Sequence, residues 1–135
     1  MGEKLTKYYS LRHINIFGTL DDPVHAKNLS EKIDYIYSHV NNPFVIAIDA
    51  SLGKHENVGN INLFNGPLSP GAGVNKTLPS VGDISLTGVV NISGFMEYVV
   101  LQNTRLSLVM KIADVMSLSL YISLKKFNNY NKMSV

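Results

Sequence analysis

One aspartate stands out because a run of apolar residues leads directly to it. Asp49 ends the stretch "PFVIAID", in which residues 44–48 are all apolar. Such a run is typical of a strand that is covered on both faces. A carboxylate at the end of that strand would lie at the sheet edge where α/β proteins bind ligands, and apolar surroundings would raise its pKa toward values useful for proton transfer. Asp49 is therefore the candidate catalytic residue, with a turn-forming or capping aspartate as the structural alternative.

A second group of polar residues lies in "GTLDDPVH", residues 18–25. If the segment before it is a strand next to the one that ends at Asp49, then Thr19, Asp22 and His25 would lie near Asp49, and we expect them to bind the ligand. The structural alternative for Asp22 is a helix N-cap, with Pro23 at the first helical position. His25 could be a ligand, a general base or a surface group.

The other candidate binding residues lie in loops. Gly73 and Asn75 belong to the Gly- and Pro-rich loop "GPLSPGAGVNKTLPSVGD" and are expected to shape the cleft, while Asn91 ends a strand and could instead only shape its loop. A divalent metal ion is the candidate cofactor. Asp49 and His25 are its candidate ligands, but no HxxxH or HExxH spacing supports a metal site. The sequence contains neither a phosphate-loop motif nor the GxSxG motif of serine hydrolases.

The composition limits the classes of protein to which this chain can belong. With 135 residues it suits one domain, expected over residues 1–127, followed by a polar tail at 128–135 that should fray. The net charge of +2 and the lack of a long basic run argue against nucleic-acid binding. Without cysteine the chain has neither disulfides nor thiol nucleophiles, which fits a cytoplasmic protein. The charged fraction of 16% is low and leaves room for a buried interface, so a homo-oligomer stays among the candidates.

The pattern of apolar residues predicts alternating strands and helices. "HINIFGTL" (13–20) is expected to be a strand, the segment from Asp22 to Val40 a helix, and residues 44–48 the next strand, which together would form a βαβ unit. Two further strands are expected around Ile61 and Leu63 and in "DISLTGVVNI" (83–92). A long helix should follow from Gly94, with a break near Ser117–Ser119; charges inside it argue against a membrane span.

Four stretches together resemble a known family: "IFGTLDDPVHAKNL", "PFVIAIDASLG", "GPLSPGAGVNKTLPSVGDISLTGVVN" and "GFMEYVVLQNTRLSLVM". They are similar to the YyaC-type candidate spore proteases of endospore-forming bacteria over residues 2–113. That family is related to the germination proteases and, more remotely, to the hydrogenase maturation endopeptidases. The resemblance implies a three-layer phosphorylase/hydrolase-like α/β fold with a mostly parallel mixed sheet. It also implies that the acid at Asp49 contributes to an active site or its metal site.

The chain departs from that family at its start. Family members begin with a further central strand and a Gly-rich turn that bears another aspartate, whereas this chain opens with "MGEKLTKYYS". We therefore expect the fold to lack the first strand of the family. We also expect the chain to be a truncated form of a longer protein and to lack peptidase activity by itself.

The function that these observations favour is a sporulation-associated peptidase that acts on a protein or peptide in the forespore or mother cell. Asp49 would activate water or hold a metal ion that does so. The alternative is a non-catalytic sporulation protein that binds a partner in the same cleft. A hydrolase of small molecules or nucleosides is a third option, because a fold does not determine a function.

Overall fold

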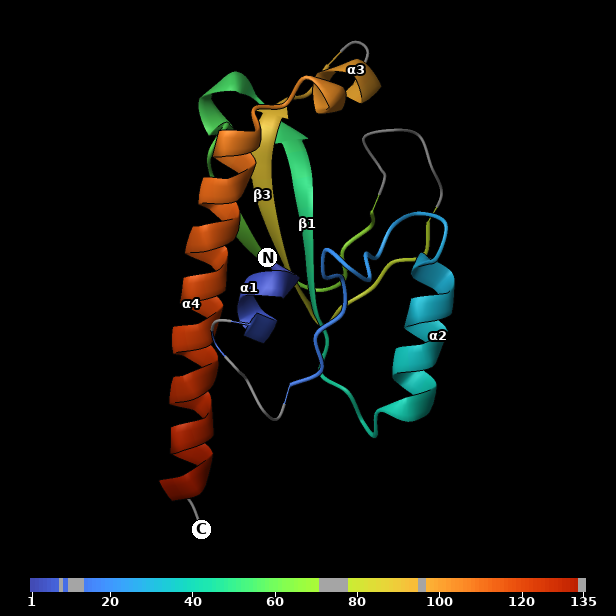
Figure 1. Ribbon diagram of the computed structural model, residues 1–135, viewed down its shortest axis with the longest axis vertical. Helices are drawn as coiled ribbons and strands as arrows, with labels where there is room; N and C mark the ends of the chain where they lie inside the picture. The colour runs from blue at the N-terminus through green and yellow to red at the C-terminus, as the bar shows by residue number, and fades with distance from the viewer. Residues whose placement is uncertain (8, 10–13, 71–77, 95–96, 134–135) are drawn as a thin grey trace. The chain divides into compact units, whose positions relative to one another are not determined.

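The computed structural model describes every residue except 8, 10–13, 71–77, 95–96 and 134–135 (Figure 1). It is an α/β protein with a three-stranded mixed sheet and helices. The chain divides into two compact units, one made of Met1–Pro23 with Met110–Val135 and the other of Val24–Val109. The sheet belongs to the second unit.

The sheet consists of β1 (Ile46–Gly53), β2 (Ile61–Asn65) and β3 (Ile84–Ile92) in the order β1-β3-β2. β1 and β3 are parallel, and β2 pairs with β3 in the antiparallel direction. All three strands match segments predicted from the sequence. β3 is central and its residues 85–90 are all buried, as expected of a strand with neighbours on both sides.

β1 extends beyond its expected end. The apolar run predicts a strand that stops at Ile48, but β1 continues through Asp49 to Gly53. Backbone pairing with β3 explains the extension, because Asp49 pairs with Thr87 and the ladder goes on to Gly53 and Ile92. The expectation that Asp49 ends its strand is therefore wrong, since this residue lies in the interior of β1.

The start of the parallel pair is fixed by Asp83. The main-chain N–H of Val45 donates to Asp83 Oδ2 at 2.7 Å, and the N–H of Asp83 donates to the carbonyl of Val45 at 2.8 Å. The preceding Gly82 has a φ of 107°, a conformation that suits only glycine. A Cβ at Gly82 would also lie 2.8 Å from the Cβ of Ala47. This tight turn therefore brings β3 against β1.

The helix α2 (Leu29–His39) begins later than the sequence predicts. Asp22 and Pro23 are not its first residues, because the hydroxyl of Thr19 holds the N–H of Asp22 in a separate turn at 3.0 Å. The helix ends where it was expected to end. The N–H of Val40 bonds to the carbonyl of Ile36, and Asn42 adopts a φ of 48° just before Pro43.

The predicted strand at residues 13–20 is not a strand. Residues 14–20, which are the described part of it, have no regular secondary structure, and the N–H of Thr19 bonds to the carbonyl of Asp22 in the following turn. A strand exists only with a hydrogen-bonded neighbour, and no strand in the described part of the chain pairs with this segment. The predicted βαβ unit is consequently absent from the described residues.

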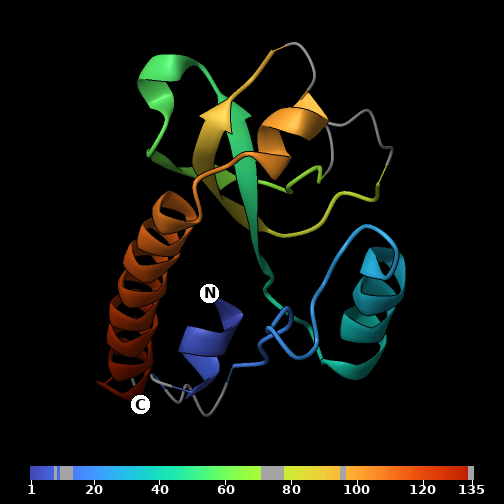
Figure 2. The same cartoon turned by 45° about the horizontal axis from the view of Figure 1, so that its top comes forward.

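The long helical stretch after β3 breaks earlier than predicted. It forms α3 (Glu97–Gln102) and α4 (Leu106–Met133), so the break lies at Asn103–Arg105 and not at Ser117–Ser119. Ser117 lies within α4, where its buried hydroxyl donates to the carbonyl of Ala113 at 2.6 Å and is thereby satisfied without a break in the helix. α4 also includes residues 128–133 of the tail that was expected to fray. α3 lies near the carboxyl end of β3 (Figure 2).

The first unit joins α1 (Gly2–Lys7) to the part of α4 that starts at Met110. Lys4 forms an ion pair with Asp114, and the rings of Tyr9 and Tyr121 stack with their centroids 4.6 Å apart. Leu5 of α1 is buried, as are three apolar residues of α4: Ile112, Met116 and Leu120. By length and composition alone, residues 106–127 of α4 could also cross a membrane, with a mean hydropathy of 1.5.

Candidate functional site

Asp49 lies in a row of polar side chains that crosses the sheet. Its partner on β3 is Thr87, and Thr87 is in turn opposite Asn62 on β2. Paired residues of neighbouring strands point to the same side of a sheet, so these three side chains share one face. We call them the Asp49 row. Thr87 is buried at its centre, while Asp49 and Asn62 are half-buried on the two edge strands.

The two faces of the sheet differ in character. The next row on the face of Asp49 consists of Ala47, Ser85 and Phe64, of which the two nearer to the carboxylate, Ala47 on β1 and Ser85 on β3, are small. On the other face the corresponding row is entirely apolar, with Ile48, Leu86 and Leu63. Asp49 therefore points to the side of the sheet that carries hydrogen-bonding groups.

Burial dominates the electrostatics of Asp49. Loss of water around the carboxylate raises its pKa, while a hydrogen bond from the N–H of Ala50 to Oδ1, at 2.8 Å, acts in the opposite direction. Within the described residues the carboxylate forms no ion pair and bonds to no other titratable side chain. A carboxyl group in this state can accept and release protons at a higher pH than an ordinary aspartate, which suits a general acid or base.

Two of the predicted binding residues form a turn with each other. The hydroxyl of Thr19 accepts the N–H of Asp22, and the N–H of Thr19 donates to the carbonyl of Asp22 at 3.1 Å. Both residues belong to the first unit, whereas Asp49 belongs to the second. The contacts of Thr19 in this turn are those of a structural residue, and a role of either residue in binding stays a prediction.

His25 organises the start of α2. Its N–H donates to Asn28 Oδ1 at 2.8 Å, its Nδ1 accepts the N–H of Lys27 at 3.2 Å, and its carbonyl accepts the N–H groups of Asn28 and Leu29. The side chain is exposed. Within the described part of the chain, no three His, Asp or Glu side chains are grouped so that they could hold a metal ion. Asp49 and His25 as metal ligands therefore stay a prediction.

Asn91 connects the end of β3 to α3. Its side-chain amide donates to the carbonyl of Val100 at 3.2 Å and to the hydroxyl of Thr104 at 3.3 Å, and its Oδ1 accepts the N–H of Ile92. These contacts support the loop-shaping alternative. The other two predicted binding residues, Gly73 and Asn75, lie outside the described residues.

Sequence reasoning missed Thr87 and Asn62 as neighbours of Asp49. Thr87 is a polar residue within the apolar stretch "ISLTGVV", which could have marked it as notable. However, its position beside Asp49 depends on the register of β1 against β3, and no local pattern determines that register. The same holds for Asp83, whose contact with Val45 spans 38 positions of the chain.

Comparison with known proteins places most of the chain in one family. A family model described as "Protein of unknown function (DUF1256)" matches residues 1–119. The chain is also 55% identical over 117 residues to the "Uncharacterized protein YyaC" of Bacillus subtilis (strain 168). That match includes 87% of this chain but only 57% of the length of the relative. No solved structure matches the chain.

Proposed function

The chain belongs to the DUF1256 family, which the match over residues 1–119 shows, and from this premise we propose that it is a sporulation-associated peptidase-like protein whose reaction centre is Asp49. The proposal joins the YyaC-type resemblance to the setting of one carboxylate. The chain spans little more than half the length of its Bacillus subtilis relative. The proposal departs from the expectation that the chain lacks peptidase activity by itself, because it assigns the activity to the segment that the two proteins share. Its expected substrate is a protein or peptide, within the forespore or mother cell.

The observation that carries the proposal is the carboxylate in the middle of β1, which has no ion-pair partner among the described residues. Burying an ionised group without a cationic partner lowers stability, and an alanine or threonine at this position would avoid that penalty. Residues whose pKa is shifted by burial cluster at functional sites. The Asp49 row adds hydrogen-bonding groups next to the carboxylate, as a binding site for a polar backbone requires.

Asp49 would act as a general base in peptide hydrolysis. Its carboxylate takes a proton from a water molecule while the water oxygen attacks the carbonyl carbon of the substrate, and the protonated Asp49 then returns the proton to the leaving amine nitrogen. The N–H of Ala50 holds Oδ1, so Oδ2 is the oxygen left for the water. The amide of Asn62, on the other side of Thr87, can donate a hydrogen bond to the substrate.

The second candidate function is binding without catalysis. It is favoured by the isolation of Asp49, which makes no hydrogen bond to another acid or to an imidazole within the described residues. Known peptidases that use carboxylates for catalysis employ a pair of them or a metal ion. A lone carboxylate in a row of amide and hydroxyl groups would recognise the N–H groups of a bound segment equally well.

The test compares Asp49→Asn with Asp34→Asn. Asp34 is an exposed acid of α2, so its replacement controls for the loss of one negative charge. Purified chain is incubated with fluorescein-labelled casein and with a mixed peptide library, and cleavage is followed by fluorescence and mass spectrometry. We expect Asp49→Asn to lower the cleavage rate by at least about 100-fold, the contribution typical of a general base, and Asp34→Asn to leave it unchanged.

The outcomes separate the two functions. Cleavage that is equal in the two variants would contradict the assignment of Asp49. Absence of cleavage by the wild-type chain, together with peptides that are retained by the wild type but not by Asp49→Asn, would favour binding without catalysis. The sporulation role is tested by expressing each variant in Bacillus subtilis that lacks YyaC and counting heat-resistant spores.

A further inference from the structure

One face of α4 carries an apolar row that ends in a lysine at both ends. Val115, Leu118 and Ile122 are exposed by 54, 47 and 45%. Lys111 and Lys125 continue the row on either side and are also exposed. The five residues follow one another at alternating spacings of four and three, which places them along one side of the helix. We call them the outer α4 row.

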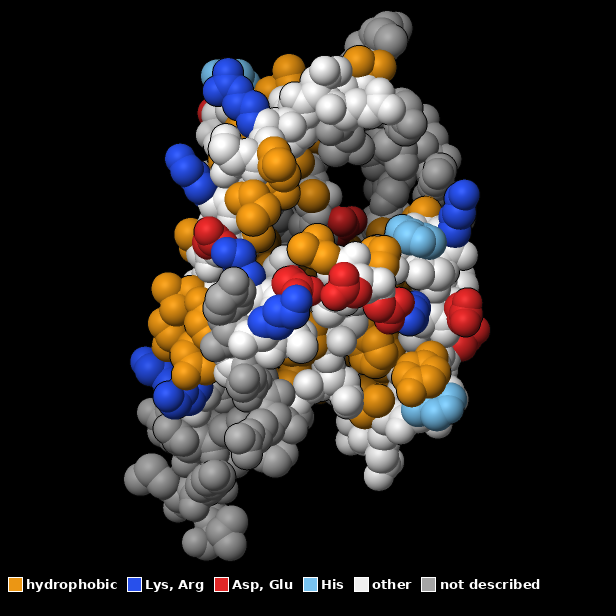
Figure 3. Space-filling model, viewed as in Figure 1, with side chains coloured by type: hydrophobic (Ala, Val, Ile, Leu, Met, Phe, Trp, Pro, Cys, Tyr) orange, Lys and Arg blue, Asp and Glu red, His pale blue; other side chains and the backbone are white. Residues whose placement is uncertain are grey.

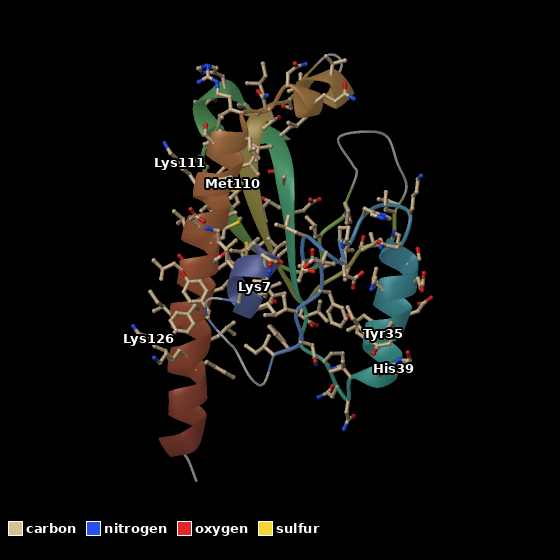
Figure 4. All side chains as sticks on the ribbon, in the orientation of Figure 1. Lys7, Tyr35, His39, Met110, Lys111 and Lys126 are labelled. Carbon is tan, nitrogen blue, oxygen red and sulfur yellow. The ribbon has the colours of Figure 1, made fainter. Side chains whose placement is uncertain are left out.

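The figures show this arrangement on the molecule. Hydrophobic side chains gather over α4 between lysine or arginine side chains (Figure 3). Lys111, at one end of the row, points away from α1, as does Lys126, which follows Lys125 at the other end (Figure 4). The row is therefore a surface with an apolar centre and basic ends.

The first unit uses the other side of α4. Ile112, Met116 and Leu120 are buried there. Asp114, which borders the outer α4 row, forms an ion pair with Lys4 of α1. Only 22% of the apolar window of α4 is buried. Core helices of soluble proteins bury most of their apolar residues, so α4 has more apolar surface than the contacts among the described residues cover.

The charge of the row indicates which charge its partner should carry. Asp114 is the single acidic residue in the sequence of α4, and Lys4 neutralises it. At one end of the row, Lys125 is held in place by Tyr121, whose hydroxyl lies 3.3 Å from Nζ and whose ring centre lies 5.5 Å away. Both ends of the row thus carry a positive charge, and at Lys125 its position is fixed by Tyr121. An acidic partner would complement these charges.

The residue types favour another helix over a lipid surface. β-Branched residues at 115 and 122 with leucine at 118 form the pattern of a two-stranded coiled-coil seam. The seam is narrow, because the exposed Asp114 and Ser119 lie on either side of it. Helices that lie in a membrane surface need a broader apolar face.

A second copy of α4 is a poor partner for this seam. In an antiparallel pair centred on Leu118, Lys111 of one chain would face Lys125 of the other, and in a parallel pair each lysine would face itself. Like charges at such positions destabilise a helix pair. We propose that the outer α4 row docks an amphipathic helix of another protein, whose apolar seam is flanked by acidic residues. This proposal is independent of Asp49 and of any catalysis.

The test uses two synthetic helices as probes. Both carry valine, leucine and isoleucine in the seam; the acidic probe has glutamate at the positions that meet Lys111 and Lys125, and the basic probe has lysine there. Binding to the full chain is measured by fluorescence anisotropy. We expect the acidic probe to bind at least about tenfold more tightly than the basic one, and a Lys111→Glu, Lys125→Glu double variant to reverse this preference.

Exposed apolar residues on the same helix supply the matched variants. Leu118→Gln and Ile122→Gln, within the row, should each weaken the acidic probe by at least about tenfold. Phe127→Gln, at an exposed position outside the row, should leave its affinity unchanged. Thermal melts monitored by circular dichroism select the variants that retain the fold. Two row variants are used so that the binding test can still be read if one of them does not fold.

Three results would overturn the proposal. The first is equal binding of the two probes, or equal affinity of the row variants and Phe127→Gln for the acidic probe. The second is a dimer of the chain in sedimentation that the row variants abolish, which would make a second copy the partner. The third is flotation with phosphatidylcholine–phosphatidylglycerol vesicles that depends on the row, without binding of the acidic probe, which would identify a lipid surface.

Discussion

At the scale of single residues, the carboxylate of Asp49 determines the functional assignment. It lies half-buried in the interior of a strand, and in the described residues its hydrogen bond comes from the N–H of Ala50. Burial raises its pKa, so at neutral pH the folded chain holds an ion in a place that favours the protonated form. A residue that lowers the stability of the fold in this way is expected to contribute to function.

The stability of Asp49→Asn should therefore depend on pH. A raised pKa in the folded state means that stability falls as pH rises from the usual aspartate pKa through the raised one, and the penalty is complete above it. We expect Asp49→Asn to melt at a higher temperature than the wild type at pH 7. Well below the usual aspartate pKa the two should melt together, because the aspartate is then protonated in both the folded and the unfolded state.

Asp34→Asn is the control for this measurement as well, since its exposed side chain should give no difference from the wild type at either pH. A melting temperature of Asp49→Asn below that of the wild type at neutral pH would show that the ionised carboxylate stabilises the fold. It would then be a structural residue.

The local sequence draws attention to Asp49 but does not identify the residues beside it. An aspartate after an apolar run is visible in one segment, whereas Thr87 and Asn62 reach it only through strand pairing. His25 and Asp22 were expected near Asp49 because residues 13–20 were predicted to form a neighbouring strand, which the described residues 14–20 do not form. Their observed contacts are turns within three or four residues, and turn residues of these types are common in any α/β protein.

At the scale of elements, the contact between β1 and the turn before β3 positions the Asp49 row. Gly82 lies against Ala47, and the carboxylate of Asp83 holds the N–H of Val45. Ala47 and Asp49 are on the same face of the same strand. A shift of β1 at this turn would therefore displace Asp49 relative to Thr87.

Replacing Gly82 by alanine should be more destabilising than replacing Gly59. Both glycines have positive φ, 107° and 98°, so both alanine variants carry backbone strain. At Gly82 the new Cβ would also meet the Cβ of Ala47 at 2.8 Å and the carbonyl oxygen of Ile84 at 2.9 Å, whereas at Gly59 it meets nothing within 4 Å. Overpacking of this kind costs about 1–3 kcal/mol, which is the expected difference in the free energy of unfolding.

Urea denaturation of the two variants provides that difference directly. Equal free energies of unfolding would mean that the contact between Gly82 and β1 contributes nothing beyond its backbone conformation. The link between this turn and the Asp49 row would then have no support.

Elements with a strong periodic pattern were predicted well, and those that depend on distant partners were not. β2, β3 and the end of α2 follow from alternation, apolar residues and the Asn-Asn-Pro stop signal. Residues 13–20 have an equally good strand pattern but no hydrogen-bonded neighbour among the described strands. A break was expected near Ser117–Ser119 because one helix over all these residues would be unusually long, but the break lies at Asn103–Arg105 and the buried Ser117 bonds within α4.

At the scale of the whole molecule, the two proposed surfaces lie in different units. The Asp49 row belongs to Val24–Val109, and the outer α4 row belongs to the unit that contains α1 and residues 110–135. Substitutions in one surface should thus leave the readout of the other unchanged, so that catalysis and docking can be tested separately in the same chain.

The most direct test of the account is the pKa of Asp49 in the intact chain, measured by NMR from the pH dependence of its carboxyl carbon-13 shift. The account predicts a midpoint above the usual aspartate value of about 3.9, because burial outweighs the hydrogen bond from Ala50. Asp49→Asn identifies the resonance by its loss. A titration midpoint at or below the usual value would mean that the carboxylate is well solvated or paired. This result would contradict the assignment of Asp49 as the reaction centre.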